Sequence, residues 1–228
     1  MTNNKKVCDG KIRDIDIRLA FVQRNIKFFE RDGYEFVSEF GINGTNIIDL
    51  ACFDFGNKRF YGFEIKSEQD NTKRLKDQLK AYVTFFQFVY VITHEKHLDK
   101  VMEIINSEIA FKGVGVIKVD SCLAFKEIKR ASEMKPLYWL FIKNMTFDDL
   151  KAIGESVNIK RTGTKEQLAS ILRRHITIDV IYKGIQDKIK KFHTRICPVC
   201  GSKLYYKHGS NRGGTKYTCF KCGSTKPY

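Results

Sequence analysis

Two short cysteine motifs near the C-terminus constrain the fold of this chain more than any other feature. The sequence reads C-P-V-C at residues 197–200 and C-F-K-C at residues 219–222, with 18 residues between the motifs and a glycine directly after each. Four thiolates at this spacing can complete a tetrahedral zinc site, which holds a small domain together without a large hydrophobic core. We therefore predict a zinc ribbon over residues 191–228, with a structural Zn²⁺ bound by Cys197, Cys200, Cys219 and Cys222.

The segment around these motifs is basic and aromatic. Residues 188–228 contain ten Lys and Arg, six aromatic residues and no Asp or Glu. Cationic side chains neutralise phosphates, and aromatic rings stack on bases. We interpret the segment as DNA-binding, with Lys203, Lys207, Arg212 and Lys216 as candidate contacts. The alternative is that the ribbon contacts a protein partner.

The net charge of +15 is concentrated in the second part of the chain. Residues 1–125 contain 19 Lys and Arg against 18 Asp and Glu, a balance of +1, whereas residues 126–228 contain 22 against 8, a balance of +14. Such a break in charge predicts a nearly neutral globular domain followed by a region that binds polyanions.

Membrane and secreted classes are not indicated. No run of about 18 apolar residues is present, and the polar start lacks the apolar core of a signal peptide. We therefore expect a cytoplasmic protein with no membrane contact. In a reducing compartment, paired cysteines bind metal rather than form disulfides, and Cys8, Cys52 and Cys122 are expected to be ordinary thiols.

The periodicity of the first half predicts an α/β domain. A helix is expected over residues 12–30, with Ile15, Leu19, Val22 and Ile26 on its apolar face. Three short apolar runs follow, which we expect to be strands. After them, a helix, a strand, a second helix and a final strand alternate. This order predicts a mixed sheet flanked by helices. The later segments are strands at 35–40, 47–55, 60–67, 88–93 and 113–119, and helices at 72–86 and 96–107.

Three charged residues interrupt the second and third of these strands. Glu64 and Lys66 share one strand face, roughly 6.6 Å apart. A hairpin turn centred on residues 57–58 would place Asp49 opposite Lys66 on that face. Such a cluster can hold a divalent cation and form a hydrolytic centre, or it can be a solvent-exposed face with an ordinary salt bridge.

One helix adds a polar side chain to this picture. Gln78 lies within the apolar stripe of the helix predicted at 72–86. A glutamine on the core side of a helix needs a polar partner, and the carboxylates of this cluster would supply one. Asp14 and Asp16 on the first helix are expected to be surface charges.

These segments together resemble the PD-(D/E)XK nuclease superfamily, most closely its small bacterial and phage members. The resemblance covers roughly residues 10–120 and rests on I-D at 48–49, F-E-I-K-S at 63–67 and R-L-x-x-Q-x-x-x-Y at 74–82. The proline that often precedes the first aspartate is replaced here by Ile48. The resemblance implies a restriction-endonuclease-like mixed sheet flanked by helices.

The resemblance also implies roles for individual residues. Asp49 and Glu64 would bind Mg²⁺ (or Mn²⁺), and Lys66 would position the attacking water or stabilise the charge that develops on the phosphate. Gln78 would support the site from its helix. Glu39 matches an acidic position often found earlier in the superfamily and would be a further metal ligand.

Residues 145–176 predict a small helical module. Thr146 begins one helix, and Thr164 with Gln167 forms a capping box at the start of another. The order of helix, extended loop and helix resembles SAP-like DNA-binding modules, and a plain helical spacer is the alternative. Residues 126–144 would connect this module to the first domain, and residues 177–190 would form a helix before the ribbon. The phosphate contacts would come from Lys160, Arg161, Lys165, Arg173 and Arg174.

The sequence therefore predicts a Mg²⁺-dependent deoxyribonuclease, with a nuclease-like domain at residues 1–125 and DNA-binding modules after it. One alternative is a catalytically inactive DNA-binding adaptor that recruits partners through its zinc ribbon. Another is a zinc-ribbon protein of the transcription type without hydrolysis. The preferred DNA structure, endonuclease or exonuclease action, the choice between DNA and RNA, and the oligomeric state stay open at this point.

Overall fold

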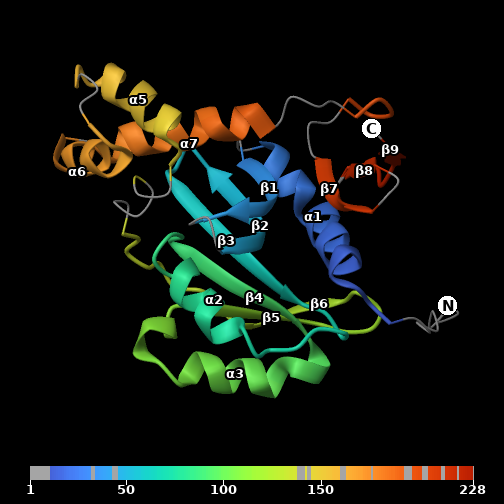
Figure 1. Ribbon diagram of the computed structural model, residues 1–228. Helices are drawn as coiled ribbons and strands as arrows, with labels where there is room; N and C mark the ends of the chain where they lie inside the picture. Colours follow the sequence, from blue (N-terminus) through green and yellow to red (C-terminus); the bar gives the residue numbers. More distant parts are fainter. Residues whose placement is uncertain are drawn as a thin grey trace, which may run out of the picture.

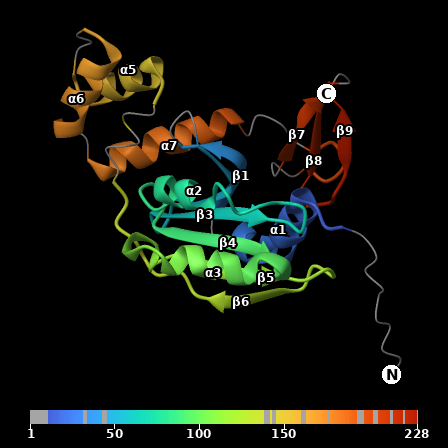
Figure 2. The same ribbon diagram turned by 60° about the horizontal axis from the view of Figure 1, so that its bottom comes forward.

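The computed structural model shows a central sheet with helices on both of its faces (Figures 1 and 2). It describes residues 11–31, 34–42, 46–137, 142, 145–159, 163–175, 177–192, 197–201, 205–211, 214–219 and 221–227. Within these residues, the main sheet has six strands in the order β1-β2-β3-β4-β5-β6. They are β1 (Tyr34–Gly41), β2 (Ile47–Asp54), β3 (Arg59–Lys66), β4 (Phe88–His94), β5 (Gly115–Val119) and β6 (Phe125–Lys129).

The sheet is mixed, as the sequence predicts. β1, β2 and β3 form an antiparallel meander, β3, β4 and β5 run parallel, and β6 is antiparallel to β5. The two parallel pairs are joined by helical crossovers, which is how parallel strands are normally connected. The helices of this part are α1 (Asp14–Arg31), α2 (Leu75–Tyr82) and α3 (Leu98–Asn106), with short 3₁₀ helices η1 (Glu95–His97) and η2 (Ile109–Phe111).

The strand β6 was not expected. Its side chains are half-buried or exposed, because it lies at the edge of the sheet and packs little against either core. The sheet therefore continues past residue 125, where the sequence placed the end of the first domain. The following connector is attached to this domain by backbone hydrogen bonds from Ser132 to Gly113, from Met134 to Gln87 and from Leu137 to Thr84.

Alternating residues of β2 divide between two hydrophobic cores. Leu50 and Cys52 pack with α1 on one face of the sheet, and Ala51 and Phe53 pack with α2 and α3 on the other. This division follows from the two-residue period of a strand. Because both faces of the central strands are covered, charged side chains in the middle of the sheet can be buried, as Glu64 and Lys66 are.

The hairpin between β2 and β3 turns at residues 55–58 and pairs Asp54 with Arg59 and Leu50 with Phe63. This register places Asp49 across from Glu64. The expected pairing of Asp49 with Lys66 is wrong, because the turn is centred one residue earlier, on Gly56-Asn57, and each residue of shift in the centre moves the partner by two positions.

After the sheet, the described residues form the helices α5 (Phe147–Ser156), α6 (Lys165–His175) and α7 (Ile178–Phe192). Both predicted helix starts are confirmed. Thr146 and Asp149 form a capping box at α5, and Thr164 and Gln167 exchange the two corresponding hydrogen bonds at α6 (2.7 and 3.3 Å). Leu150, Ile153, Leu168 and Leu172 are buried between these helices.

The helix α7 fastens this helical part to the sheet through Tyr182. Its ring packs edge-on against Phe60, with ring centroids 4.6 Å apart, and its hydroxyl donates to the carbonyl of Lys58 (2.7 Å). The Gln87 amide donates to the same carbonyl (2.7 Å) and to the Tyr182 hydroxyl (3.2 Å). The helical part and the sheet consequently share one continuous core.

A second, three-stranded antiparallel sheet lies near the C-terminus. It consists of β7 (Tyr205–Asn211), β8 (Gly214–Cys219) and β9 (Thr225–Pro227). In Figures 1 and 2 this small sheet lies next to α1 and β1, at the opposite end of α7 from α5 and α6. Gly223 of this region approaches the side chain of Gln23 on α1.

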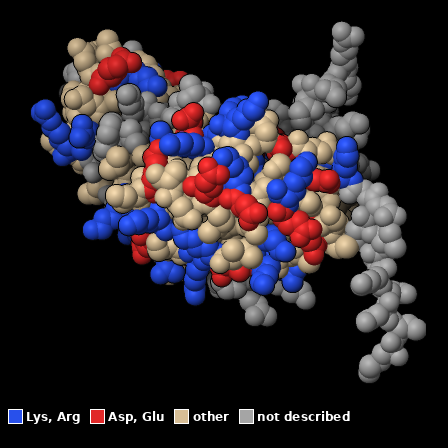
Figure 3. All heavy atoms as spheres, turned by 90° about the horizontal axis from the view of Figure 1, so that it is seen from below, with Lys and Arg blue, Asp and Glu red and all other residues tan. Residues whose placement is uncertain are grey.

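The face of the molecule that carries α3 shows acidic and basic side chains interspersed (Figure 3). This mixture agrees with the near balance of charge in residues 1–125. A continuous basic surface is absent from the described residues on that face, so a polyanion would find no extended cationic surface there.

Two smaller expectations concern the membrane and the thiols. Among the described helices, none is both long and apolar enough to cross a bilayer. Cys52 is a buried free thiol, as expected. Cys122 forms a disulfide bond instead of the expected free thiol.

We predict that Tyr182→Phe lowers the free energy of unfolding by about 1–2 kcal/mol, because the buried hydroxyl makes two hydrogen bonds and the ring contact is kept. Thermal unfolding measures the change. Tyr90→Phe is the control, because its hydroxyl bonds Glu127 at an exposed 3.2 Å contact and the backbone of Ala131, and it should cost less than Tyr182→Phe. Equal stabilities of the two variants would contradict the role given to Tyr182.

Candidate functional site

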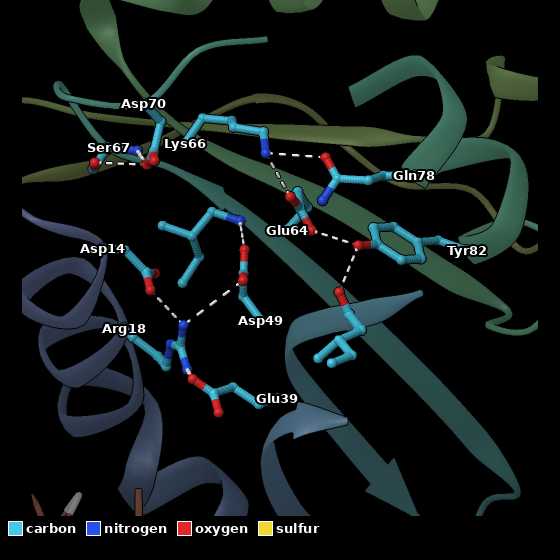
Figure 4. Close-up of polar contacts among 12 residues, drawn as sticks. Asp14, Arg18, Glu39, Asp49, Glu64, Lys66, Ser67, Asp70, Gln78 and Tyr82 are labelled. Carbon is cyan, nitrogen blue, oxygen red and sulfur yellow. Dashed lines mark hydrogen bonds and ion pairs between the residues drawn. The ribbon is translucent and has the colours of Figure 1, made fainter. Parts of the chain in front are cut away.

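The charged residues singled out in the sequence meet where β2 and β3 separate (Figure 4). The paired register of these strands ends at Leu50 and Phe63. Beyond that pair, Oδ2 of Asp49 accepts a hydrogen bond from the backbone N–H of Ile65 (2.7 Å). The carboxylate thus takes the place of a strand carbonyl, and this contact fixes its position. Its other oxygen, Oδ1, lies 3.7 Å from Arg18, beyond hydrogen-bond distance.

Glu64 is almost fully buried, with 1% of its surface exposed. Two groups hold its carboxylate. Oε1 accepts from Nζ of Lys66 (2.6 Å), and Oε2 accepts from the hydroxyl of Tyr82 on α2 (2.8 Å). A buried carboxylate is stable only with such partners, so each oxygen of Glu64 has a defined direction.

Lys66 is also buried, and α2 supplies its second partner. The amide oxygen of Gln78 accepts from Nζ at 3.1 Å. Gln78 therefore has the polar partner that its place in an apolar stripe required. That partner is the ammonium of Lys66 rather than a carboxylate.

Glu39 reaches the same region from β1 through an unusual backbone conformation. It has a φ of +52°, a left-handed value that is uncommon for a residue other than glycine. It lies between the strand pairs Ser38–Leu50 and Phe40–Ile48. Its carboxylate lies 3.8 Å from the guanidinium of Arg18, so Glu39 faces a cation from α1.

The helix α1 brings two residues to the site that were not expected there from the sequence. Arg18 is 1% exposed and forms ion pairs with Asp14, Glu39 and Asp49. Asp14 was expected to be a surface charge, and this is wrong: its carboxylate pairs with Arg18, and its Oδ1 is buried without a hydrogen-bond partner in the described structure. Asp16 is a surface charge, as expected, and pairs with Arg13.

The reason for this error lies in the orientation of α1. The buried positions include Ile17, Phe21 and Val22, whereas Ile15 and Leu19 are only half-buried. The buried face of α1 is therefore rotated by about one residue from the apolar face that was expected, and this rotation brings Asp14 and Arg18 toward the sheet. One feature of the sequence could have indicated this orientation. Asp14 and Arg18 stand at positions i and i+4, where they can form an ion pair, and Arg18 lies one turn before the buried Val22.

The crowding of carboxylates raises two pKa values. Burial is the main cause for Asp49, whose pKa lies well above its usual range, and the neighbouring Glu64 raises it further, while Arg18 and the Ile65 N–H oppose the shift. Burial raises the pKa of Asp14 to about 6 against the opposing effect of Arg18. The site therefore holds more negative charge than its two cations neutralise.

These residues fit a hard divalent cation. Carboxylate oxygens are the ligands that Mg²⁺ prefers, and the register of β2 and β3 places Glu64 across from Asp49. Within the described residues, the carboxylates do not form a tight group of three or more metal ligands, because Arg18 and Lys66 lie among them.

The four cysteines do form a tight group. Their Sγ atoms all lie within 4.8 Å of one another, with 3.7 Å between Cys197 and Cys222 and 3.6 Å between Cys200 and Cys219. Zinc–sulfur bonds of about 2.3 Å in a tetrahedron require sulfur–sulfur distances of about 3.8 Å. The geometry therefore fits a metal ion such as zinc.

The glycine after each cysteine pair has a conformational role. Gly201 and Gly223 have φ values of +70° and +71°. Their N–H groups donate to the carbonyls of Cys197 and Cys219, each at 2.8 Å. Two turns of the same form thus present the two pairs of thiols to one point, and glycine adopts this left-handed conformation without strain.

The structure describes only some of the residues that we expect to contact DNA. Arg173 and Arg174 are exposed in the last turn of α6, and Lys165 is half-buried at its start. Lys207 lies in β7 and Lys216 in β8; their side chains are outside the description. The remaining four expected contacts lie outside the described residues: Lys160, Arg161, Lys203 and Arg212.

Residues 20–201 match the family described as Bacteriophage P4 protein cII. The chain belongs to this family. The matched range includes the six-stranded sheet, α5 to α7 and the first cysteine pair, and it ends before the second pair. A search of curated proteins finds no match.

Among solved structures, the SPO1766 protein of unknown function from Silicibacter pomeroyi is similar at 12% sequence identity and a TM-score of 0.41. The similarity covers 66% of this chain and 97% of that one.

We predict that Cys200→Ser abolishes stoichiometric zinc binding, because one of four thiolates is lost and most of the folding free energy of a small zinc domain comes from its metal. Zinc per purified chain, measured by mass spectrometry of the elements, checks this. Cys52→Ala is the control and should keep its zinc. Retention of zinc by Cys200→Ser would contradict the assignment.

We predict that Asp14→Asn stabilises the metal-free protein at pH 8 but not at pH 4. The pKa of Asp14 is about 6 in the folded state and 3.8 when unperturbed, so its ionised form costs folding free energy. The cost is absent below about pH 4 and complete above about pH 6. After allowance for its partial exposure, the gain at pH 8 should be roughly 1–2 kcal/mol.

Thermal unfolding in EDTA at both pH values measures this gain. Asp16→Asn is the matched control. The pKa of Asp16 is lowered by its hydrogen bonds to Arg13, which outweigh the opposing effect of desolvation, so its loss should destabilise the protein slightly at pH 8. A gain for Asp14→Asn that is equal at the two pH values would refute the electrostatic explanation.

Proposed function

We propose that this chain is a metal-dependent DNA nuclease with a restriction-endonuclease-like catalytic domain. The observation that carries the proposal is that Asp49, Glu64 and Lys66 come together at the point where β2 and β3 separate, between α1 on one face of the sheet and α2 on the other. Burial of charged groups is costly even when they are paired, so a purely structural role would be served as well by apolar residues.

Each residue has a defined task under this proposal. When bound, Mg²⁺ supplies an activated water and shields the charge on the phosphate. Asp49 and Glu64 would hold it, with Asp49 fixed by the Ile65 N–H and Glu64 by the Tyr82 hydroxyl. Lys66 would stabilise the developing negative charge, which requires that its ammonium be held in place.

The neighbours of Lys66 provide that restraint. Glu64 and Gln78 hold Nζ at 2.6 and 3.1 Å. Because the ammonium sits in a mostly buried site, its electrostatic effect on a phosphate is stronger than it would be in water. Mutation of Gln78 would loosen Lys66 without removing a charge.

Binding of the polyanion is assigned to the second part of the chain. Its charge balance of +14 supplies the sequence-independent attraction to phosphate. The exposed arginines at the end of α6 are candidate contacts, and the fusion of α7 to the sheet would keep α5 and α6 at a fixed position relative to the catalytic face.

The zinc ribbon is proposed as a second nucleic-acid contact. Support comes from the absence of acidic residues and the six aromatic residues within 188–228. Aromatic rings between basic side chains suit single-stranded or distorted DNA. We also propose that the protein acts in the cytoplasm and that its ribbon contacts a protein partner. The inactive DNA-binding adaptor is the alternative to the nuclease, and the cleavage experiment described next distinguishes the two.

We predict that Glu64→Gln and Lys66→Met each lower the rate of DNA cleavage by at least about 100-fold, because each removes a charge used in the reaction. Cleavage should be measured on labelled single-stranded, duplex, flap and four-way-junction DNA, and on RNA of the same sequences, with Mg²⁺, Mn²⁺ or EDTA. DNA binding, measured by fluorescence anisotropy, should change by less than about threefold.

Two matched controls test whether the effect belongs to the site. Glu127→Gln removes an exposed carboxylate that also contacts a tyrosine hydroxyl, and Lys118→Met removes a half-buried partner of Glu95. Both variants should cut like the wild type. If the wild type cuts none of the substrates with either metal yet binds them, the nuclease proposal fails and the adaptor replaces it.

A further inference from the structure

Arg18 is a buried cation within a group of acids. Its side chain is 2% exposed, and it comes from α1 on the face of the sheet that this helix covers. A side chain so deeply buried cannot reach a phosphate of DNA. Any effect it has on the site must therefore pass through the residues that it contacts.

Those contacts are three carboxylates from three different elements. Asp14 comes from α1, Glu39 from β1 at 3.8 Å, and Asp49 from β2 at 3.7 Å. Figure 4 shows the guanidinium pointing between them, with Glu64 and Lys66 on the other side of Asp49. An arginine stays protonated at every pH at which a protein is folded, so this is a permanent positive charge.

The position of Arg18 divides the acids into two sets. Asp14 and Glu39 face the guanidinium, whereas Glu64 faces Lys66 and Tyr82. Asp49 alone lies between the two sets, with one oxygen toward Arg18. A second divalent ion between Asp49, Asp14 and Glu39 would have to occupy the space of the guanidinium and would be repelled by its charge.

We propose that Arg18 is a positioning residue that takes the place of a second metal ion, so that the site binds one divalent cation, between Asp49 and Glu64. The inference rests on the proposed nuclease function, and it removes Glu39 from the set of metal ligands. Glu39 and Asp14 then serve to hold Arg18, and Arg18 holds Asp49 toward the single ion.

The first test counts bound ions. Zinc-loaded full-length protein is titrated with Mn²⁺, and free Mn²⁺ is measured by electron paramagnetic resonance. The wild type should bind one Mn²⁺ per chain. Arg18→Met, which keeps the bulk and removes the charge, should bind two. Arg18→Lys should bind one, and so should Arg13→Met, the matched control on the same helix, whose exposed arginine pairs with Asp16.

Thermal unfolding gives a second readout. In EDTA, Arg18→Met should unfold roughly 5–10 °C below the wild type, because three carboxylates lose their shared cation. Mn²⁺ should raise its midpoint more than it raises that of the wild type. Arg13→Met should match the wild type in both conditions.

A third arm does not depend on the folding of Arg18→Met. Asp49→Asn and Glu64→Gln should abolish Mn²⁺ binding, whereas Asp14→Asn and Glu39→Gln should weaken it by less than about threefold, since neither contacts the ion. Two Mn²⁺ in the wild type, one in a folded Arg18→Met, or loss of binding in Glu39→Gln would each overturn the inference. A wild type that binds no Mn²⁺ and cuts no DNA would instead refute the proposed function itself.

Discussion

The hydrogen bond from the Ile65 N–H to the Asp49 carboxylate is the contact on which the candidate site depends. Where two antiparallel strands separate, each loses a backbone partner, and a buried N–H without an acceptor is costly. Asp49 satisfies that N–H with its side chain. The strands can therefore diverge without loss, and beyond the last backbone pair they are linked by this side-chain contact instead of by a ladder of backbone bonds.

The charges around this point are balanced by neighbours from other elements. Arg18 arrives from α1, and Tyr82 and Gln78 arrive from α2, so the sheet is linked to a helix on each of its faces by polar contacts. The raised pKa values of Asp14 and Asp49 show that the balance is incomplete. Stability given up in this way is typical of a site kept for chemistry or binding.

Much of the fold could be predicted from local patterns. The bounds of β2 and β4, the helix start at Thr146 and the capping box at Thr164 agree closely with the structure, because period-two alternation and capping are local effects. The edge strand β6 was missed, since an exposed strand has little apolar pattern. The pairing of Asp49 was placed two residues away, because the register depends on the centre of the turn, which a sequence marks only weakly.

The sequence by itself identified the four-cysteine cluster with its two glycines and the uneven charge. It also identified Asp49, Glu64, Lys66 and Gln78 as candidate site residues. These are set by spacing along one strand, one helix or one turn. Only the tertiary structure decided that Asp14 and Arg18 join them and that Glu39 faces an arginine. The rotation of α1 against the sheet is fixed by packing with residues distant in the chain, and a shift of one residue there exchanges a surface charge for a buried one.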